Sequence, residues 1–184
     1  MTIQELSQFY WLTREIAQKV VDGMRAEGTP FAGMLFCGMM MTASGPKVLE
    51  FNTRFGDPET QAIMVRLDSD VVDLFDAAVD GTAENLAVRM RPGASVCVIL
   101  ASGGYPGKVV NGKAISGLER MGEDVVVFHS GTAVKDGQLV TAGGRVLGVT
   151  ATADTRESAL AAAYDAVARI SFPQAFYRKD IGKV

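Results

Sequence analysis

The chain has 184 residues, a formal net charge of −3 and 48% hydrophobic residues, which suits one compact domain or two small ones. Charges of both signs are scattered, without the basic stripe of a nucleic-acid binder. The N-terminal residues lack the basic region of a signal peptide, and the longest apolar stretch, residues 31–43, is too short to span a bilayer. We therefore expect a cytoplasmic protein that binds neither nucleic acid nor membrane.

Sulfur-containing residues gather in apolar runs. Cys37 and Cys97 both lie inside such runs, which favours buried thiols in a reducing compartment over a disulfide. The consecutive methionines at residues 39–41 are expected in the core for the same reason. No Cys/His spacing indicates zinc, because the chain has a single histidine, His129, for which we expect no catalytic role.

The first part of the chain predicts a helix and a hairpin. Apolar residues recur at helical steps over residues 3–27, and Gly28 then provides a stop. Two strands follow at residues 31–42 and 47–55, separated by a cluster of turn residues at 43–46. A long helix followed by a hairpin is therefore the expected order.

Two further helices should follow the hairpin. One begins at Asp57-Pro58-Glu59, because Asp can cap a helix and Pro fits its first position. The other begins at Asp70 and ends before Gly81, with its apolar residues on one face. Helices and antiparallel strands in this mixture predict an α+β fold.

Beyond a polar boundary segment at residues 82–93, the composition becomes that of a small β-rich domain. Apolar runs predict strands, Lys135-Asp136-Gly137-Gln138 predicts a hairpin turn, and an alanine-rich segment with Thr155 as its cap predicts a helix. The expected strands span residues 94–101, 124–128 and 144–152, and the helix spans residues 155–170.

The segment from Glu50 to Glu59 carries the most informative pattern. Successive side chains of a strand point to opposite faces, so one face presents a carboxylate, an amide oxygen and a guanidinium, from Glu50, Asn52 and Arg54. The other face is aromatic and expected to be packed, with Phe51, Thr53 and Phe55. Such oxygens suit Mg²⁺, and an arginine can meet the charge of a phosphoryl group. The alternative is a half-buried strand with a solvated polar face, followed by Asp57 as a helix cap.

Two further segments are candidates for binding an anion. The loop Gly103–Gly107, which contains Gly104 and Tyr105, can offer backbone N–H groups to a phosphate or can simply be a turn. Arg178 and Lys179 form a basic pair whose apolar neighbours indicate a packed tail, and a substrate phosphate is the natural ligand for it. Arg145 is interpreted as a surface residue of a hairpin.

The segment Glu50–Gln61 closely resembles the signature of the phosphoribosylamine–glycine ligases (glycinamide ribonucleotide synthetases). Five other segments are similar to motifs of that family and occur in its order, at residues 27–33, 103–107, 128–132, 143–147 and 178–182. The resemblance runs from about Val20 to the end of the chain. It implies that residues 1–86 are the end of an ATP-grasp domain and that residues 87–184 are the family's small C-terminal domain.

The resemblance also implies an activity and roles for the matched residues. The expected reaction uses ATP to convert glycine to glycyl phosphate, which the amine of 5-phosphoribosylamine attacks to give glycinamide ribonucleotide, ADP and phosphate. Glu50 and Asn52 would ligate Mg²⁺ or Mn²⁺, Arg54 would stabilise the acyl phosphate, and Asp57 would contact the phosphoribosylamine. Gly104, Tyr105, Arg178 and Lys179 would bind its phosphate.

The chain lacks segments that the family's chains contain. Their N-terminal α/β domain, their glycine-rich phosphate loop and most of their ATP pocket have no counterpart here, so we expect no activity from the chain alone. The missing N-terminal portion of the same enzyme is then an expected partner. The alternatives are a non-catalytic module that binds a ribose phosphate and an inactive product of a truncated gene.

Overall fold

The computed structural model describes residues 12–182, so residues 3–11 of the helix predicted over residues 3–27 lie outside the described part. The chain divides into two compact units. Unit 1 comprises Met1–Gly56 and Asp70–Ala87, and unit 2 comprises Asp57–Ser69 and Val88–Val184. The domain boundary expected between residues 86 and 87 stays a prediction. Helices and antiparallel strands occur together, which confirms the α+β class.

Within residues 12–182, the helices of unit 1 end near the predicted residues, and α4 also begins where predicted. A π-helical segment, η1 (Leu12–Ala17), continues into α2 (Gln18–Ala26), and Gly28 follows at φ +78°, a conformation that glycine adopts readily. Further along, Asp70 caps α4 (Val71–Val79), because its carboxylate accepts a hydrogen bond of 2.8 Å from the Val72 N–H. The short 3₁₀ helix η2 (Ala83–Asn85) ends the unit.

The hairpin of unit 1 is shorter than predicted. Strands β1 (Phe36–Thr42) and β2 (Gly45–Asn52) are antiparallel, and Thr42 pairs with Gly45 across a two-residue turn. At the open end Phe36 pairs with Asn52. Because neither strand has a partner beyond that pair, the predicted strands 31–42 and 47–55 were too long. Arg54 therefore lies outside the strand, and the expected row with Glu50 and Asn52 was wrong in that respect.

Apolar side chains of the hairpin are more exposed than expected. Phe51 is 42% exposed, so the aromatic face predicted for this strand is not packed at that residue within the described chain. Met40 and Met41, which were expected in the core, are likewise exposed. The sequence pattern identified these residues as apolar but did not show whether other residues cover them.

Unit 2 is built on a four-stranded antiparallel sheet with the order β4-β7-β3-β8. Its strands include the predicted runs at residues 94–101, 124–128 and 144–152, with boundaries shifted by one residue. Their observed bounds are β3 (Ala94–Ser102), β4 (Val125–His129), β7 (Arg145–Ala153) and β8 (Ala175–Phe176).

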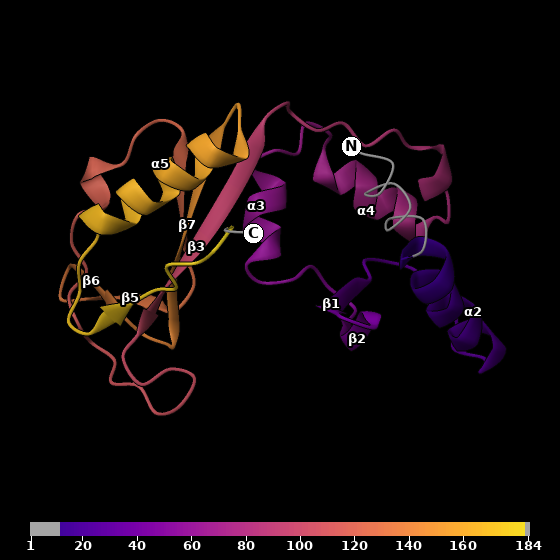
Figure 1. Ribbon diagram of the computed structural model, residues 1–184, viewed down its shortest axis with the longest axis horizontal. Coiled ribbons are helices and arrows are strands. Elements are labelled where there is room, and N and C mark those ends of the chain that lie inside the picture. The colour runs from indigo at the N-terminus through magenta and orange to yellow at the C-terminus, as the bar shows by residue number, and fades with distance from the viewer. Residues whose placement is uncertain (1–11, 183–184) are drawn as a thin grey trace. The chain divides into compact units, whose positions relative to one another are not determined.

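One face of this sheet packs against α5 (Arg156–Arg169), which Figure 1 shows lying across β3 and β7. Alternate residues of β3, such as Val98 and Leu100, enter the core together with Ala163 and Val167 of the helix. Thr155 caps α5 as predicted, with its hydroxyl accepting from the Ser158 N–H at 3.2 Å. Burial of this apolar face is the main force holding unit 2 together.

The opposite face of the sheet receives α3 (Glu59–Met64). The Ser95 hydroxyl of β3 donates to the Ala62 carbonyl oxygen at 2.7 Å, and the Gln61 side chain lies close to Gly148 of β7. Since Ser95, Cys97 and Ile99 alternate with the core residues of β3, they face this side. The start of α3 is thereby held beside the middle of the sheet.

Smaller elements complete unit 2. Strands β5 (Thr132–Lys135) and β6 (Gln138–Thr141) form the predicted hairpin, whose turn residues Asp136 and Gly137 both have positive φ. The 3₁₀ helix η3 (Leu118–Arg120) precedes β4. Over residues 12–182, no helix combines the length and the apolar character that crossing a membrane requires.

Candidate functional site

The predicted metal ligands lie together on β2 of unit 1. Glu50 and Asn52 are two residues apart on the strand and thus project from the same side. Glu50 pairs with Gly38 of β1, and a Cβ atom added to Gly38 would lie only 3.0 Å from the Glu50 Cγ atom. The glycine therefore leaves room for the stem of the Glu50 side chain to lie across the neighbouring strand.

The oxygens of this strand fit a cation that takes few protein ligands. Across residues 12–182, no three His, Cys, Asp or Glu side chains gather closely enough to hold a metal ion by themselves. Mg²⁺ commonly takes one or two protein oxygens, with phosphate oxygens and water as its other ligands. One carboxylate and one amide oxygen match that pattern better than they match a cage for zinc.

Arg54 follows the strand rather than belonging to it. Its Nη1 atom donates a 2.8 Å hydrogen bond to the Phe55 carbonyl oxygen, so the guanidinium folds back onto the backbone. The Phe55 ring in turn contacts Phe75 of α4, with 6.3 Å between the ring centroids. This contact ties the segment after the strand to the helix of the same unit.

Asp57 does not cap α3, which corrects the prediction. The residue before the helix is Pro58, the helix begins at Glu59, and no side chain caps its first turn. The Asp57 carboxylate instead accepts 2.8 Å from Gln61 Nε2 through Oδ1 and 3.1 Å from Arg145 Nη1 through Oδ2. Asp57 thus lies one residue before the N-cap position, and its carboxylate is engaged by Gln61 and Arg145.

Arg145 connects Asp57 to the glycine-rich loop. Its Nη1 atom also donates to the Asp57 carbonyl oxygen, and its Nε atom donates to the Tyr105 hydroxyl at 3.1 Å. Burial opposes the charged form, but the hydrogen bonds to Tyr105 and Asp57 outweigh it and raise the pKa of Arg145. The interpretation of Arg145 as a surface hairpin residue was therefore wrong.

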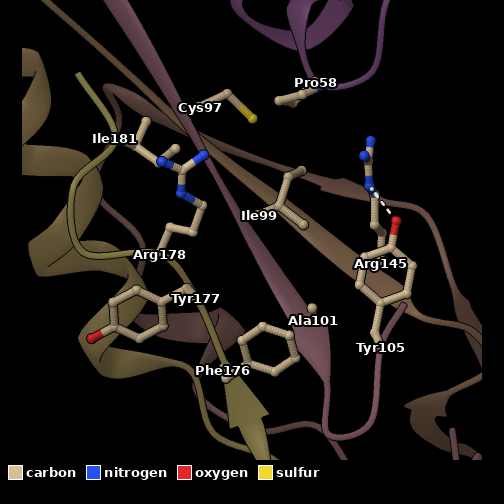
Figure 2. A pocket seen from close by; sticks show the side chains of 10 residues that line it. All are labelled: Pro58, Cys97, Ile99, Ala101, Tyr105, Arg145, Phe176, Tyr177, Arg178 and Ile181. Atoms are coloured by element: carbon tan, nitrogen blue, oxygen red, sulfur yellow. Dashed lines mark hydrogen bonds between the residues drawn. The ribbon is translucent and has the colours of Figure 1, made fainter. Parts of the chain in front are cut away.

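A pocket of about 260 Å³ opens beside this cluster, entirely within unit 2. Its floor is apolar and comes from the face of β3 opposite the core, with Cys97, Ile99 and Ala101. Figure 2 shows the guanidinium groups of Arg145 and Arg178 on either side of Cys97 and Ile99. The remaining lining residues are Pro58, Tyr105, Phe176, Tyr177 and Ile181.

The C-terminal segment is held against α5, and its packing agrees with the prediction made from the apolar neighbours of the basic pair. The Tyr164 hydroxyl of α5 donates to the Arg178 carbonyl oxygen at 2.9 Å and accepts from the Ile181 N–H at 3.0 Å. Asp180 accepts two bonds from the Arg178 guanidinium, 3.0 Å from Nε and 2.7 Å from Nη2. These bonds contact Arg178 at the pocket, although its side chain is 70% exposed. The adjacent Lys179 is also exposed and does not line the pocket.

The glycine-rich loop uses part of its backbone for its own turn. Gly104 has φ +97°, the Tyr105 N–H donates to Ser102 at 3.1 Å, and the Gly107 N–H donates to Gly104 at 2.7 Å. Tyr105 lines the pocket through its side chain, whereas Gly104 does not line it. The direct contribution of this loop to the pocket is thus an aromatic ring with a hydroxyl.

Two models of one protein family match the sequence, in the order of the chain. The ATP-grasp (A) domain of phosphoribosylglycinamide synthetase matches residues 4–60, and the C domain of the same enzyme matches residues 95–184. The chain belongs to the phosphoribosylglycinamide synthetase family. The resemblance noted from separate sequence motifs is confirmed.

Individual members of the family extend well beyond the segment matched here. The phosphoribosylamine–glycine ligases of Brucella melitensis and Mesorhizobium japonicum are 47% and 49% identical over 92% of this chain. The chain spans 40% of the length of each of these relatives. A solved phosphoribosylamine–glycine ligase from Thermotoga maritima gives a TM-score of 0.73 at 37% identity, covering 86% of this chain and 39% of its own.

A more distant structure shares the fold alone. The biotin carboxylase domain of Hydrogenobacter thermophilus 2-oxoglutarate carboxylase gives a TM-score of 0.61 at 16% identity. The match covers 98% of this chain and 41% of that domain's chain, and the domain was solved with MgADP and bicarbonate.

Sequence reasoning missed Arg145 because a glycine pair before a strand usually marks a turn. The signal lay in Gly144, at which a Cβ atom would collide with the Tyr105 ring, coming within 2.8 Å of Cε2. A glycine that gives space to an aromatic ring indicates close packing between two loops. Within this synthetase-family fold, that packing brings Arg145 to Asp57.

Proposed function

We propose that the chain carries the C-terminal portion of a phosphoribosylamine–glycine ligase. The reaction joins glycine to 5-phosphoribosylamine by way of glycyl phosphate and converts ATP to ADP and phosphate. One observation carries the proposal: the strand with Glu50 and Asn52 and the pocket with two arginines fall in the segments that the two family models match. Such an enzyme of purine synthesis would work in the cytoplasm, where the two free thiols remain reduced.

Glu50 and Asn52 are proposed to hold Mg²⁺ or Mn²⁺ through one carboxylate and one amide oxygen. When bound, such a cation would neutralise charge on the nucleotide phosphates. The exposed Glu50 side chain and the gap at Gly38 support this role, because the carboxylate can turn toward a ligand without displacing β1. Arg54 is proposed to stabilise the acyl phosphate, for which its guanidinium must leave the Phe55 carbonyl oxygen.

Arg178 is proposed to bind the phosphate of 5-phosphoribosylamine at the pocket. Asp180 occupies Nε and Nη2 of the guanidinium, which has five N–H donors in total. The donors on Nη1 remain for a phosphate, and the exposed ion pair with Asp180 restricts the guanidinium only weakly. Lys179 and the loop residues Gly104 and Tyr105 are proposed to assist, and Asp57 is proposed to contact the substrate amine.

The core of unit 2 favours a second candidate function. That core encloses one face of the sheet, and the pocket is formed by residues of the same unit. A domain with its own core and a formed pocket can bind a ribose phosphate without catalysing any reaction. This binding-module function requires no contribution from the strand with Glu50.

A test of the ligase function joins this chain to the N-terminal portion of the Brucella melitensis relative. ADP release should then depend on both glycine and 5-phosphoribosylamine. The variant Glu50→Gln should lower turnover about ten-fold or more at limiting Mg²⁺, because a charged ligand becomes neutral. Glu84→Gln, which changes an exposed carboxylate of η2, is the matched control and should have no effect.

The outcomes separate the two functions. Wild-type turnover in Glu50→Gln at limiting Mg²⁺ would contradict the metal assignment. A joined protein that binds ribose 5-phosphate but releases no ADP would favour the binding module.

A further inference from the structure

Arg145 joins three parts of unit 2 that are far apart in the sequence. It starts β7, its Nη1 atom bonds to Asp57 just before α3, and its Nε atom bonds to Tyr105 in the loop after β3. The Tyr105 ring also lies under the guanidinium, with 6.0 Å between the Arg145 Cζ atom and the ring centroid. One side chain therefore fixes both a carboxylate and an aromatic ring beside the pocket.

We propose that Arg145 is a positioning residue that holds Asp57 and Tyr105 in place and neutralises Asp57 beside an anion-binding pocket. This inference rests on the proposed phosphate-binding role of the pocket. It assigns to Arg145 an action through Asp57 rather than direct capture of the phosphate.

The geometry around Asp57 supports this role. Both oxygens of the Asp57 carboxylate are engaged, Oδ1 by Gln61 and Oδ2 by Arg145, so the side chain is held from two sides. A planar guanidinium can serve Asp57 and Tyr105 at once because its donors point in fixed directions. A lysine at this position would retain the charge but would lack that fork of donors.

The charges beside the pocket also support this role. Asp57 precedes Pro58, which lines the pocket, and an unpaired carboxylate there would repel an incoming phosphate. The ion pair of 3.1 Å with Arg145 offsets that charge. The Arg145 side chain is 39% exposed, so the offset is partial rather than that of a fully buried pair.

Gly144, which precedes Arg145, supports the same role. A Cβ atom there would enter the Tyr105 ring, so glycine allows the ring to lie against the start of β7 and its hydroxyl to reach Arg145. The glycine, the ring and the guanidinium thus form one packed arrangement. Gly144→Ala should disturb the same contacts as a change of Arg145.

The test measures binding of ribose 5-phosphate to the 184-residue chain by isothermal titration calorimetry. Arg145→Gln should weaken binding about ten-fold, because Asp57 loses its partner and its negative charge is left beside the pocket. In the Asp57→Asn background, the same Arg145→Gln change should alter binding by no more than about two-fold, since no charge remains to be neutralised and only the contact with Tyr105 is still lost. If Arg145 had only a structural role, the effect of Arg145→Gln would not depend on the charge of Asp57.

Arg169→Gln is the matched control. Arg169 also bridges a carboxylate and a carbonyl, those of Asp165 and Arg120, but it does not line the pocket. It should leave the affinity unchanged. A ten-fold loss with Arg145→Gln that persists in the Asp57→Asn background would overturn the inference, because Arg145 would then be a direct phosphate ligand.

Failure of the inference can be told apart from failure of the proposed pocket function. If wild type binds ribose 5-phosphate and Arg145→Gln binds it equally well, only the role of Arg145 is wrong. If wild type binds none, the phosphate role fails, and amide exchange of the loop Gly103–Gly107 decides the positioning role. Faster exchange in Arg145→Gln but not in Arg169→Gln supports that role, and unchanged exchange overturns it.

Discussion

The two units of this chain differ most in how their apolar side chains are covered. In unit 2, Val98, Val146 and Val149 are fully buried between the sheet and α5. Within the described part of unit 1, Ile16 and Ala77 are the only buried hydrophobic residues, and Val79 of α4 is 84% exposed. The pocket of unit 2 is therefore backed by a packed core of the same unit. The strand with Glu50 and Asn52, in unit 1, instead belongs to a hairpin with exposed apolar residues.

This difference indicates that the two proposed sites depend on their surroundings in different ways. A pocket whose floor is the back of a packed sheet has its shape fixed by that packing. A carboxylate on a thinly covered hairpin gains a fixed position only when further protein or a ligand restrains it.

The largest expected effect is on stability. Leu100→Ala should reduce the free energy of unfolding of unit 2 by about 2–5 kcal/mol, because it leaves a cavity under α5. Leu49→Ala removes the same atoms from a residue of β2 that is 63% exposed and should change stability by about 0.5 kcal/mol or less. Native-state amide exchange of β3 and of β2 measures the two effects, and equal losses would show that unit 1 is as well packed as unit 2.

A smaller effect is expected at the glycine opposite Glu50. Gly38→Ala would press on the Glu50 side chain and should raise the Mg²⁺ concentration for half-maximal activity of the joined enzyme about ten-fold. Gly23→Ala, at a helix position with open space around it, is the control and should leave the Mg²⁺ dependence unchanged. A normal Mg²⁺ dependence in Gly38→Ala would show that the position of Glu50 does not need the glycine.

The smallest effect concerns thiol reactivity. Burial raises the pKa of the thiols of both Cys37 and Cys97, but Cys97 is buried whereas Cys37 is half-buried. Since the thiolate is the reactive species and must be reached by the reagent, Cys97 should be alkylated by iodoacetamide more slowly than Cys37. Mass spectrometry of peptides after timed alkylation measures this, and faster reaction at Cys97 would mean that the pocket floor opens readily.

Local sequence patterns predicted the elements of unit 2 well because the capping and turn residues agree with the apolar pattern of the neighbouring segments. A helix cap is determined by Thr155 before an alanine-rich segment, and a hairpin turn is determined by Asp136-Gly137 between two short strands. Both features depend only on residues close in the sequence. The antiparallel hairpin of unit 1 was predicted for the same reason. The ends of its strands were not predicted correctly, because each strand ends where its pairing with the other strand ends.

The candidate site was predicted in part. The alternation of Glu50 and Asn52 and the packing of the tail around Arg178 follow from local sequence. The partners of the Asp57 carboxylate could not be predicted in this way, because Asp57 and Arg145 are 88 residues apart. A local capping rule does not include ion pairs with residues so distant in the sequence. Arg145 was misjudged for the same reason, since only the folded sheet brings it beside the loop with Tyr105.

The central claim is that the pocket of unit 2 recognises a phosphate through Arg178. Calorimetric titration of the 184-residue chain with ribose 5-phosphate and with ribose isolates the phosphate contribution. The account predicts that ribose 5-phosphate binds more tightly and that Arg178→Ala weakens its binding about ten- to a hundred-fold. Arg156→Ala, at an ion pair of α5 outside the pocket, should change nothing. Equal affinity of wild type and Arg178→Ala for ribose 5-phosphate would contradict the account.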